Sequence, residues 1–390
     1  MLDPGSAFVL KNRGAVLHRL GRFADALADA ELALAQAPHD GDLHLNRGNA
    51  LLGLKRYSEA LAAYARVAPN DPGAIDAAFG SASALRDLGR RQEALQLYVR
   101  VLASQPSHFE ALIAAAALLT KERRQEDALG FYDRAIAAAP SRMEGHQGRA
   151  AVLFDMHRAQ EALDSYERAY ACDPDAPLLE GQRLLTKYFL CSWDNIENLS
   201  AQLIRHVAEG KHACDPFTFL TVAPDANAQW LCARQYASRF YPAQTPLFAK
   251  RARKQERIRI GYVSGEMREQ ATAYLTAGLF EEHDRAHFAC YGYSTGKADE
   301  NPMRKRLMKA FDAFADAQHI SDENLAARIA ADEIDILVNL NGYFGAERTG
   351  VFALKPAPLQ VNYLGFPGTD RKSTRLNSSH VSESRMPSSA

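Results

Sequence analysis

Four short loops in the last third of the chain combine glycine with polar side chains, a composition typical of binding loops. They read GEMREQ at 265–270, TGKADEN at 295–301, NGYFGAER at 341–348 and FPGT at 366–369. The glycine spacing of GYVSGE differs from the GxGxxG of dinucleotide sites, and the sequence has no GKS or GKT phosphate loop. The five cysteines form no CxxC pair and no Cys/His cluster of metal-ligand spacing, and no Ser/His/Asp set can be placed. The loops therefore indicate a polar ligand site and give no sign of a dinucleotide cofactor or a metal.

The segments around these loops alternate between strand-like and helix-like patterns. The strand-like runs are RIRIGYVS at 257–264, HFACYGYS at 287–294, IDILVNL at 334–340 and LQVNYLG at 359–365. Helical spacing is found in TAYLTAGLFEEHD at 272–284, PMRKRLMKAFDAF at 302–314 and DENLAARIAAD at 322–332. This alternation predicts right-handed crossovers and a parallel, Rossmann-like sheet over 257–369. In such sheets ligands bind beyond the carboxyl ends of the strands, which is where the four loops are expected.

A different pattern, with a period of 34 residues, fills the first half of the chain. It is carried by five prolines and five alanines, namely Pro38, Pro72, Pro106, Pro140 and Pro174, and Ala26, Ala60, Ala94, Ala128 and Ala162. LGRF, LKRY and LGRR mark the turn between the two helices of a unit. The period predicts five tetratricopeptide repeats over 1–176, stacked into an α-helical superhelix whose groove holds extended peptide. Pro4 stands 34 residues before Pro38, so we also expect that an earlier repeat precedes Met1 in the natural protein.

Asparagines in the first two repeats are candidates for peptide binding in this groove. Asn12 and Asn46 occupy the same repeat position, and Asn49 follows three residues later. An asparagine amide can bond both the N–H and the C=O of a peptide backbone. The equivalent positions hold Gly80, Ala114 and Gly148, so any ladder of amides is short. The alternative is that these asparagines face solvent and have no such role.

Composition limits the other partners. The formal net charge of -1 gives no electrostatic case for nucleic acid or a membrane surface. A helical connector is predicted over 177–256. The basic run at 250–259, KRARKQERIR, could be a phosphate patch, but a charge run between domains is more often a solvated linker. The longest apolar run, 111–119, is about half a membrane span. No export signal is visible at the N-terminus, so we expect a cytoplasmic protein.

Three segments resemble the first catalytic half of the protein O-GlcNAc transferase family, the GT-B glycosyltransferases with N-terminal tetratricopeptide repeats. They are IRIGYVSGEMREQATAYL, IDILVNLNGY and FALKPAPLQVNYLGFPGT, and CSW at 191–193 fits the connector. The resemblance covers 2–369. It implies a metal-independent, inverting transfer of a sugar, such as GlcNAc from UDP-GlcNAc, to Ser or Thr of proteins held by the repeats.

Two departures from the family leave the general base open. Gln270 stands where many members have His, and an amide cannot accept a proton. Asn339 stands where bacterial members often have Asp. Glu266 or Glu269 could substitute, although either could be an ordinary loop carboxylate. The resemblance further assigns substrate-binding or cleft-shaping positions to Tyr343, Arg348, Gly365, Pro367, Gly368 and Thr369.

From Asp370 the sequence becomes DRKSTRLNSSHVSESRMPSSA, with little to bury. Its back-translation fits a sequencing adapter, so we expect residues 370–390 to be a disordered read artefact. Family members instead continue into a second Rossmann-like half that supplies most nucleotide contacts, so this fragment alone is expected to be inactive. Two alternatives stay open at this point. One is a non-catalytic repeat adaptor with a degenerate transferase fold, and the other is a flagellin glycosyltransferase that uses a different nucleotide sugar.

Overall fold

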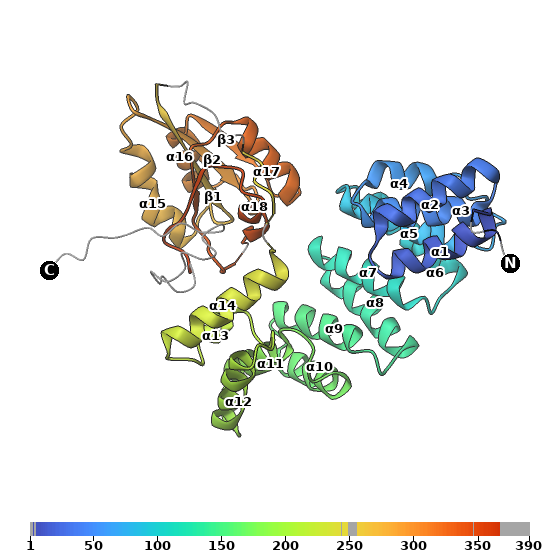
Figure 1. The fold of residues 1–390 in the computed structure, drawn as a ribbon. Coiled ribbons are helices and arrows are strands. Elements are labelled where there is room, and N and C mark those ends of the chain that lie inside the picture. Colours follow the sequence, from blue (N-terminus) through green and yellow to red (C-terminus); the bar gives the residue numbers. More distant parts are fainter. Residues whose placement is uncertain (1–2, 4, 243, 249–255, 346, 367–390) are drawn as a thin grey trace. The chain divides into compact units, whose positions relative to one another are not determined.

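The structure is a computed structural model that describes residues 3, 5–242, 244–248, 256–345 and 347–366. Contacts divide the chain into two compact units, Met1–Pro174 and Asp175–Ala390 (Figure 1). The first unit is helical, and the second combines helices with a parallel sheet. This confirms the predicted fold class, a tetratricopeptide array followed by an α/β Rossmann-like half-domain. In the described part of the chain, no helix is long and apolar enough to cross a membrane.

The described residues of the first unit form five consecutive helix pairs. Their bounds are α1 (Ala7–Arg19), α2 (Phe23–Gln36), α3 (Gly41–Gly53), α4 (Tyr57–Tyr64), α5 (Ala74–Asp87), α6 (Arg91–Ser104), α7 (Phe109–Lys121), α8 (Gln125–Ala138), α9 (Met143–Asp155) and α10 (Ala159–Cys172). Within each pair the two helices pack together, and the second helix packs on the first helix of the next pair. The alanines of the 34-residue period are almost completely buried, which lets the helices of each pair approach closely.

Tyrosines join neighbouring repeats at glycines. The ring of Tyr64 lies so close to Gly48 and Gly80 that a Cβ atom at either glycine would overlap it, and Tyr132 excludes a Cβ at Gly148 in the same way. Gly80 and Gly148 are the positions where the asparagine series of the first two repeats ends. The series therefore ends for a packing reason, because a tyrosine of the preceding repeat occupies the space of the side chain.

The second unit begins with four helices, α11 (Leu179–Phe189), α12 (Ile196–Ala208), α13 (Pro216–Leu220) and α14 (Ala226–Phe240). They share a small core that includes Leu203, Phe219, Cys214 and Cys232. The Cys232 thiol lies 3.4 Å from the carbonyl oxygen of Cys214, and burial raises the pKa of Cys232 to about 12. This thiol is therefore a packing group and stays protonated near neutral pH.

Five parallel strands follow in the spatial order β3-β2-β1-β4-β5. Their bounds are β1 (Ile258–Ser264), β2 (Phe288–Ser294), β3 (Ala313–Asp316), β4 (Ile336–Asn339) and β5 (Leu359–Asn362). The register places Ile260 opposite both Cys290 of β2 and Ile336 of β4. The chain winds from β1 to β3 on one side and then returns to β4 on the other, so the topological switch point lies between β1 and β4.

Helices cover both faces of the sheet. On one face, α15 (Ala271–Glu281) and α16 (Pro302–Ala310) enclose a core around Tyr262, Phe280 and Leu307 (Figure 1). On the other face, α17 (Asp322–Ala331) and α18 (Thr349–Ala353) enclose a core around Tyr293, Leu337 and Phe352. The strands are accordingly apolar on both sides, as the predicted crossovers require.

One sequence prediction is corrected here. The helix expected over 302–314 ends at Ala310, and the edge strand β3 begins three residues later. Phe311 is already extended, with φ -107° and ψ 147°, and the Asp312 N–H donates to the carbonyl of Cys290 in β2 at 2.8 Å. Pairing with β2 therefore outweighs the local helical periodicity at Asp312 and the residues that follow.

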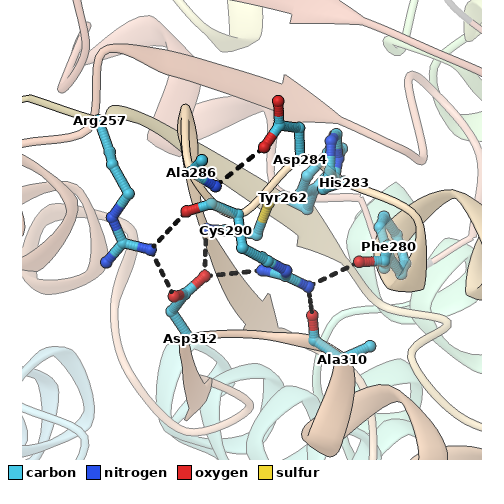
Figure 2. Close-up of polar contacts among 10 residues, drawn as sticks. Arg257, Tyr262, Phe280, His283, Asp284, Ala286, Cys290, Ala310 and Asp312 are labelled. Atoms are coloured by element: carbon cyan, nitrogen blue, oxygen red, sulfur yellow. Dashed lines mark hydrogen bonds and ion pairs between the residues drawn. The ribbon is translucent and has the colours of Figure 1, made fainter.

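Charged side chains close the amino edge of the sheet (Figure 2). The Asp312 carboxylate accepts hydrogen bonds from the Cys290 N–H at 2.8 Å, from Arg285 at 2.7 Å and from Arg257 at 3.1 Å. Arg285 also donates to the carbonyls of Phe280 and Ala310, which lie in the last turns of α15 and α16. Burial raises the pKa of Asp312, but the Cys290 N–H and the two arginines outweigh it, so the net pKa is below the ordinary value. This cluster fastens two strands and two helices to one carboxylate.

Candidate functional site

The loops after β1 and β4 meet at the switch point of the sheet. The Gly265 N–H donates to the Asn341 side-chain oxygen at 2.9 Å, which ties the two loops together. The Asn341 amide nitrogen in turn donates to the carbonyl of Phe344 at 3.2 Å. Asn341 is only 3% exposed. The buried Asn341 side chain therefore holds the loops after β1 and β4 in position.

Glycines bring the backbones of these loops into direct contact. A Cβ atom at Gly296, after β2, would overlap the carbonyl of Gly265, after β1. A Cβ atom at Gly365, after β5, would overlap the backbone of Asn341, after β4. Four strand ends are thus joined through positions that only glycine can occupy, and the predicted site residue Gly365 belongs to this arrangement.

Glu266 lies at the junction of the two loops. A Cβ atom at Gly345 would be 3.8 Å from Glu266 Oε1, which places the carboxylate beside this glycine. The Thr272 hydroxyl donates to Oε2 of the same carboxylate. The Glu266 N–H donates to the Ser264 hydroxyl oxygen at 3.0 Å. The carboxylate is therefore oriented by α15 while one oxygen faces the glycine-rich loop.

The other two candidates of this loop are more exposed. Gln270 is the residue before α15 and makes no side-chain cap to the helix. Its N–H donates to the carbonyl of Arg268 at 2.7 Å, so the tight loop is held by its backbone. Glu269 accepts a hydrogen bond from the Tyr274 hydroxyl at 3.3 Å. The structure therefore brings Glu266 to the meeting point of the loops and leaves Gln270 and Glu269 at its rim.

Asn339 lies at the carboxyl end of β4 and is 5% exposed. Its side-chain oxygen accepts hydrogen bonds from the N–H groups of Asn341 at 3.0 Å and Gly342 at 3.1 Å. These contacts form a turn that starts the NGYFGAER loop, which is a common use of asparagine after a strand. The observed contacts of Asn339 thus shape the loop that carries the site.

A buried arginine holds the opposite side of the Glu266 loop. The Arg304 side chain, on α16, is only 3% exposed. Its Nη1 donates to the Met267 carbonyl at 3.2 Å and to the Ser294 hydroxyl at 3.0 Å, and its Nη2 pairs with Asp316. The guanidinium also lies 5.1 Å from the centre of the Phe314 ring. Arg304 therefore connects the carboxyl ends of β1, β2 and β3.

Helix α14 and the residue that follows it, Tyr241, contact the loop after β4. Tyr343 packs edge-on against Tyr236 with ring centroids 5.7 Å apart, and the Tyr241 hydroxyl donates to Glu347 at 2.7 Å. Burial raises the pKa of Tyr236 to about 12. A cavity of about 20 Å³ remains between helix and loop, enough for one water molecule. It is lined by Ala237, Tyr241, Asn339, Gly342, Tyr343, Thr349, Phe352 and Asn362.

The remaining predicted positions fall into three groups. Arg348 binds Asp322 and the carbonyls of Ala317 and Ile320, so it fixes the loop after β3. Pro367, Gly368 and Thr369, and the expected artefact at 370–390, lie outside the described residues. The repeat asparagines form a third group.

These asparagines already have partners within the first unit. The Asn12 amide donates to the carbonyl of Phe8 at 3.0 Å, and the Asn46 amide reaches the carbonyl of Lys11 in the preceding repeat at 3.3 Å. Asn49 accepts a hydrogen bond from the Tyr64 hydroxyl at 2.8 Å. Of the three, only Asn12 is exposed, so a peptide ladder stays a prediction in which a bound backbone would compete with these contacts.

Sequence reasoning did not single out Asn341, Thr272 or Arg304. Asn341 could have been found, because it is a polar residue directly after a predicted buried strand. Arg304 shares a helical stripe with Leu307 and Phe311, at spacings of three and seven, which signals a buried position. Within the described residues, no group of three or more His, Cys, Asp or Glu side chains is placed to hold a metal ion.

Comparisons with known proteins agree with this architecture. Residues 236–375 match the model of Glycosyl transferase family 41, and residues 13–75 and 79–142 match a Tetratricopeptide repeat model. An Arabidopsis thaliana protein named "Probable UDP-N-acetylglucosamine--peptide N-acetylglucosaminyltransferase SEC" is 30% identical over 204 residues, which are 48% of this chain and 21% of that protein. A Caenorhabditis elegans UDP-N-acetylglucosamine--peptide N-acetylglucosaminyltransferase is 39% identical over 115 residues, 29% of this chain and 10% of that protein.

Among solved structures, a mutant of the Thermobaculum terrenum O-GlcNAc transferase is similar with a TM-score of 0.45 and 25% identity. That similarity covers 76% of this chain and 51% of the other. The matches to the two curated relatives span only a tenth to about a fifth of their lengths. In sequence, residues 236–375 are thus similar to glycosyltransferase family 41, and residues 13–75 and 79–142 are similar to tetratricopeptide repeats.

Proposed function

We propose that this chain is part of a protein O-glycosyltransferase that transfers GlcNAc from UDP-GlcNAc to Ser or Thr hydroxyls of protein substrates. The observation that carries the proposal is the match of residues 236–375 to glycosyltransferase family 41, together with the activity named for the two relatives. The geometry supports it, since polar loops meet at the switch point beyond the carboxyl ends of β1 and β4.

In the proposed reaction, Glu266 is the general base. The acceptor hydroxyl loses its proton to the Glu266 carboxylate, and its oxygen forms a bond to the anomeric carbon of the sugar. The bond between that carbon and the diphosphate oxygen breaks, and the nucleoside diphosphate leaves with the electron pair. Thr272 holds one carboxylate oxygen, which leaves the other beside Gly345 to receive the proton. Gln270 cannot take this role because an amide does not accept a proton at neutral pH.

The other residues of the site would position rather than react. Asn341 and Arg304 hold the Glu266 loop from two sides, through the Gly265 N–H and the Met267 carbonyl. Asn339 fixes the start of the loop after β4. We propose that the tetratricopeptide repeats bring the protein substrate, as their general use in holding extended peptides suggests.

The test is transfer of radiolabelled GlcNAc from UDP-GlcNAc to acceptor proteins. We expect transfer by the gene product extended to the length of its relatives, and none by the present chain, since the leaving diphosphate needs cationic or N–H groups across a complete cleft. UDP-glucose and UDP-galactose in parallel reactions test the donor. Absence of transfer with every donor would contradict the transferase proposal and favour the adaptor, whereas transfer of another sugar would correct the donor alone.

A further inference from the structure

We propose that the outer surface of α15 and α16 docks an amphipathic helix whose apolar face is bordered by acidic side chains. This surface, here called the α15–α16 face, consists of Tyr274, Leu275, Gly278 and Leu279 of α15 and Lys305, Arg306 and Lys309 of α16. None of these side chains has a role in the proposed transfer reaction, so the inference goes beyond that function. It is carried by exposed apolar area, an open notch and the placement of charge.

The solvent side of α15 is apolar, although the opposite side of the helix already fills the core. Ala273, Ala277 and Phe280 belong to the core around Tyr262. On the solvent side, Tyr274, Leu275 and Leu279 are 59%, 69% and 41% exposed. With Gly278 they recur at spacings of three and four, so they share one face of the helix. No charged residue occurs from Ala271 to Phe280, and a helix that is apolar all round is normally covered on all sides.

Helix α17, on the other face of the sheet, shows how a solvated helix of this domain is built. Its exposed positions include Glu323, Asn324 and Arg328, whereas its apolar residues Leu325 and Ile329 are buried. Helix α15 departs from this pattern. Single exposed apolar residues are ordinary, but neighbouring ones that form a continuous stripe mark an interaction surface.

Gly278 leaves a notch in the middle of this stripe. Among the described residues, no side chain or neighbouring element lies within 4 Å of the position of a Cβ atom at Gly278. Glycine is less favourable than alanine inside a helix, and packing within the domain gives no reason for it here. A side chain of a partner helix can enter such a gap between the ridges formed by Leu275 and Leu279. A docked helix therefore accounts for both the glycine and the exposed leucines.

Cations of α16 border the stripe. The two helices pack side by side on one face of the sheet, and every charged residue of α16 is a cation (Figure 1). Arg306 pairs with Glu281 at 2.7 Å and Lys305 with Glu300 at 3.1 Å, whereas Lys309 contacts no acid within the part of the chain that the structure describes. An open groove of about 640 Å³ runs along these residues and is lined by the cations Arg285, Lys305, Arg306 and Lys309 and the acids Glu281 and Glu300.

This arrangement decides which occupant fits the face. A helix with an acidic border places carboxylates near Lys309 and the other cations, which favours its association and its orientation. A second copy of this chain, packed face to face, would bring the same cations together, and their repulsion opposes such a pairing. A lipid surface supplies no side chain for the notch at Gly278. The α15–α16 face therefore fits an acidic amphipathic helix of a protein partner.

Binding of two designed helical peptides to the full chain tests the inference. Both have about 18 residues, enough to span α15, and the same stripe of leucine and alanine, bordered by Glu in one peptide and by Lys in the other. Fluorescence anisotropy should show that the Glu peptide binds roughly tenfold more tightly. Leu275→Gln should weaken its binding roughly tenfold, because an apolar contact is lost. Lys309→Glu should weaken it about three- to fivefold, and less at high salt.

Gly278→Leu separates a shaped docking site from a merely sticky surface. The variant adds apolar area but fills the notch, so it should weaken binding of the Glu peptide about fivefold or more. Matched controls are Leu32→Gln, at a leucine that is 58% exposed on α2, and Arg168→Glu, at an exposed cation on α10. Both should leave the affinity unchanged, and a melting curve verifies that each variant is folded.

Several outcomes would overturn the proposal. They are the absence of saturable binding by the Glu peptide, equal binding of the two peptides, and a Gly278→Leu variant that binds as tightly as the wild type. A dimer in light scattering that Leu275→Gln dissociates would assign the face to a second copy instead. Binding to vesicles of phosphatidylcholine and phosphatidylserine that is lost in Leu275→Gln would assign it to a membrane. None of these measurements requires sugar transfer, so the proposed transferase function fails or stands separately.

Discussion

At the amino edge of the sheet, strands and helices are held by charged side chains whose partners lie within the domain, whereas at the carboxyl edge glycines and amides join the loops beside the buried Arg304 and its partner Asp316. Asp312 alone accepts from two arginines and a backbone N–H. At the other edge, Gly296 and Gly365 let backbones touch, and Glu266 keeps one oxygen beside an open glycine. One edge uses its charges for stability, and the other keeps polar atoms available for a ligand.

The comparison also separates two ways of fixing a loop. Ion pairs at the amino edge tolerate small movements, because side chains can follow their partners. Backbone contacts at the carboxyl edge tolerate none, because there is no room for even one methyl group. Substitutions at the two edges should therefore differ in size and in pH dependence.

The largest effect is expected for Gly296→Val. Its side chain would overlap the Gly265 carbonyl, and neither backbone can move without breaking the contact between the β1 and β2 loops. We expect a loss of about 3 kcal/mol or more in the free energy of unfolding of this domain. Urea denaturation measures it. Gly278→Ala is the control, since nothing lies within 4 Å of its Cβ position on α15, and it should stabilise by roughly 0.5–1 kcal/mol.

Arg304→Met should have the next largest effect. The variant leaves the Met267 carbonyl and the Ser294 hydroxyl buried without this donor, which costs about 2–3 kcal/mol. Arg306→Met, on the same helix, removes only an exposed pair with Glu281 at 2.7 Å and should cost about 0–1 kcal/mol. Similar losses for the two variants in urea denaturation would show that the hydrogen bonds of Arg304 to Met267 and Ser294 do not stabilise the domain.

At the amino edge, Asp312→Asn should cost about 1–2 kcal/mol at pH 7, because charge-assisted hydrogen bonds to Arg257 and Arg285 are weakened. The pKa of Asp312 is lower in the folded protein than in the unfolded chain, so its contribution is fully present above the ordinary carboxyl pKa. It is lost as the pH falls through the folded value. The difference between wild type and variant should therefore shrink below roughly pH 4. A difference that is the same at pH 7 and pH 3 would contradict the ion-pair explanation.

The smallest effect on stability is expected for Glu266→Gln, within about 0.5 kcal/mol, because the amide oxygen can still accept from Thr272. In the extended gene product the same variant should lower the rate of sugar transfer by about a hundredfold or more, since the proton acceptor is lost. Glu269→Gln discriminates between the two carboxylates of the loop. If Glu269→Gln abolishes transfer while Glu266→Gln retains it, the assignment of the base is wrong.

The repeats and the parallel sheet could be predicted from the sequence because both depend on periodic burial. The 34-residue spacing of alanine and proline predicts the helix pairs directly, and the alternation of strands and helices predicts the crossover connections between parallel strands. The edge strand β3 could not be predicted in this way. Four residues, Ala313–Asp316, are too few to show a period, and the run continues the pattern of the preceding helix.

The site was predictable only in part. The loops that carry Glu266 and Tyr343 could be predicted, because each follows a buried strand. The contacts between their side chains could not be predicted from the sequence. In the segment PMRKRL, Arg304 is followed by the exposed cations Lys305 and Arg306, so the sequence does not reveal its burial. The burial of Arg304 depends on its contacts with Ser294 and Asp316, at the ends of β2 and β3. The ring contact between Phe217 and Phe344 joins residues that are more than a hundred positions apart, which no local pattern can predict.

The tyrosine-glycine contacts between repeats have a consequence for how such arrays can be shuffled by recombination. Tyr64 requires Gly80 in the following repeat, and Tyr132 requires Gly148, whereas the first repeat has Ala30 and is followed by Asn46. A repeat carrying the tyrosine, transplanted in front of one carrying the asparagine, would meet a side chain in the space of its ring. Duplication or exchange in this array therefore preserves packing when it carries Tyr64 together with both Gly48 and Gly80, and Tyr132 together with Gly148.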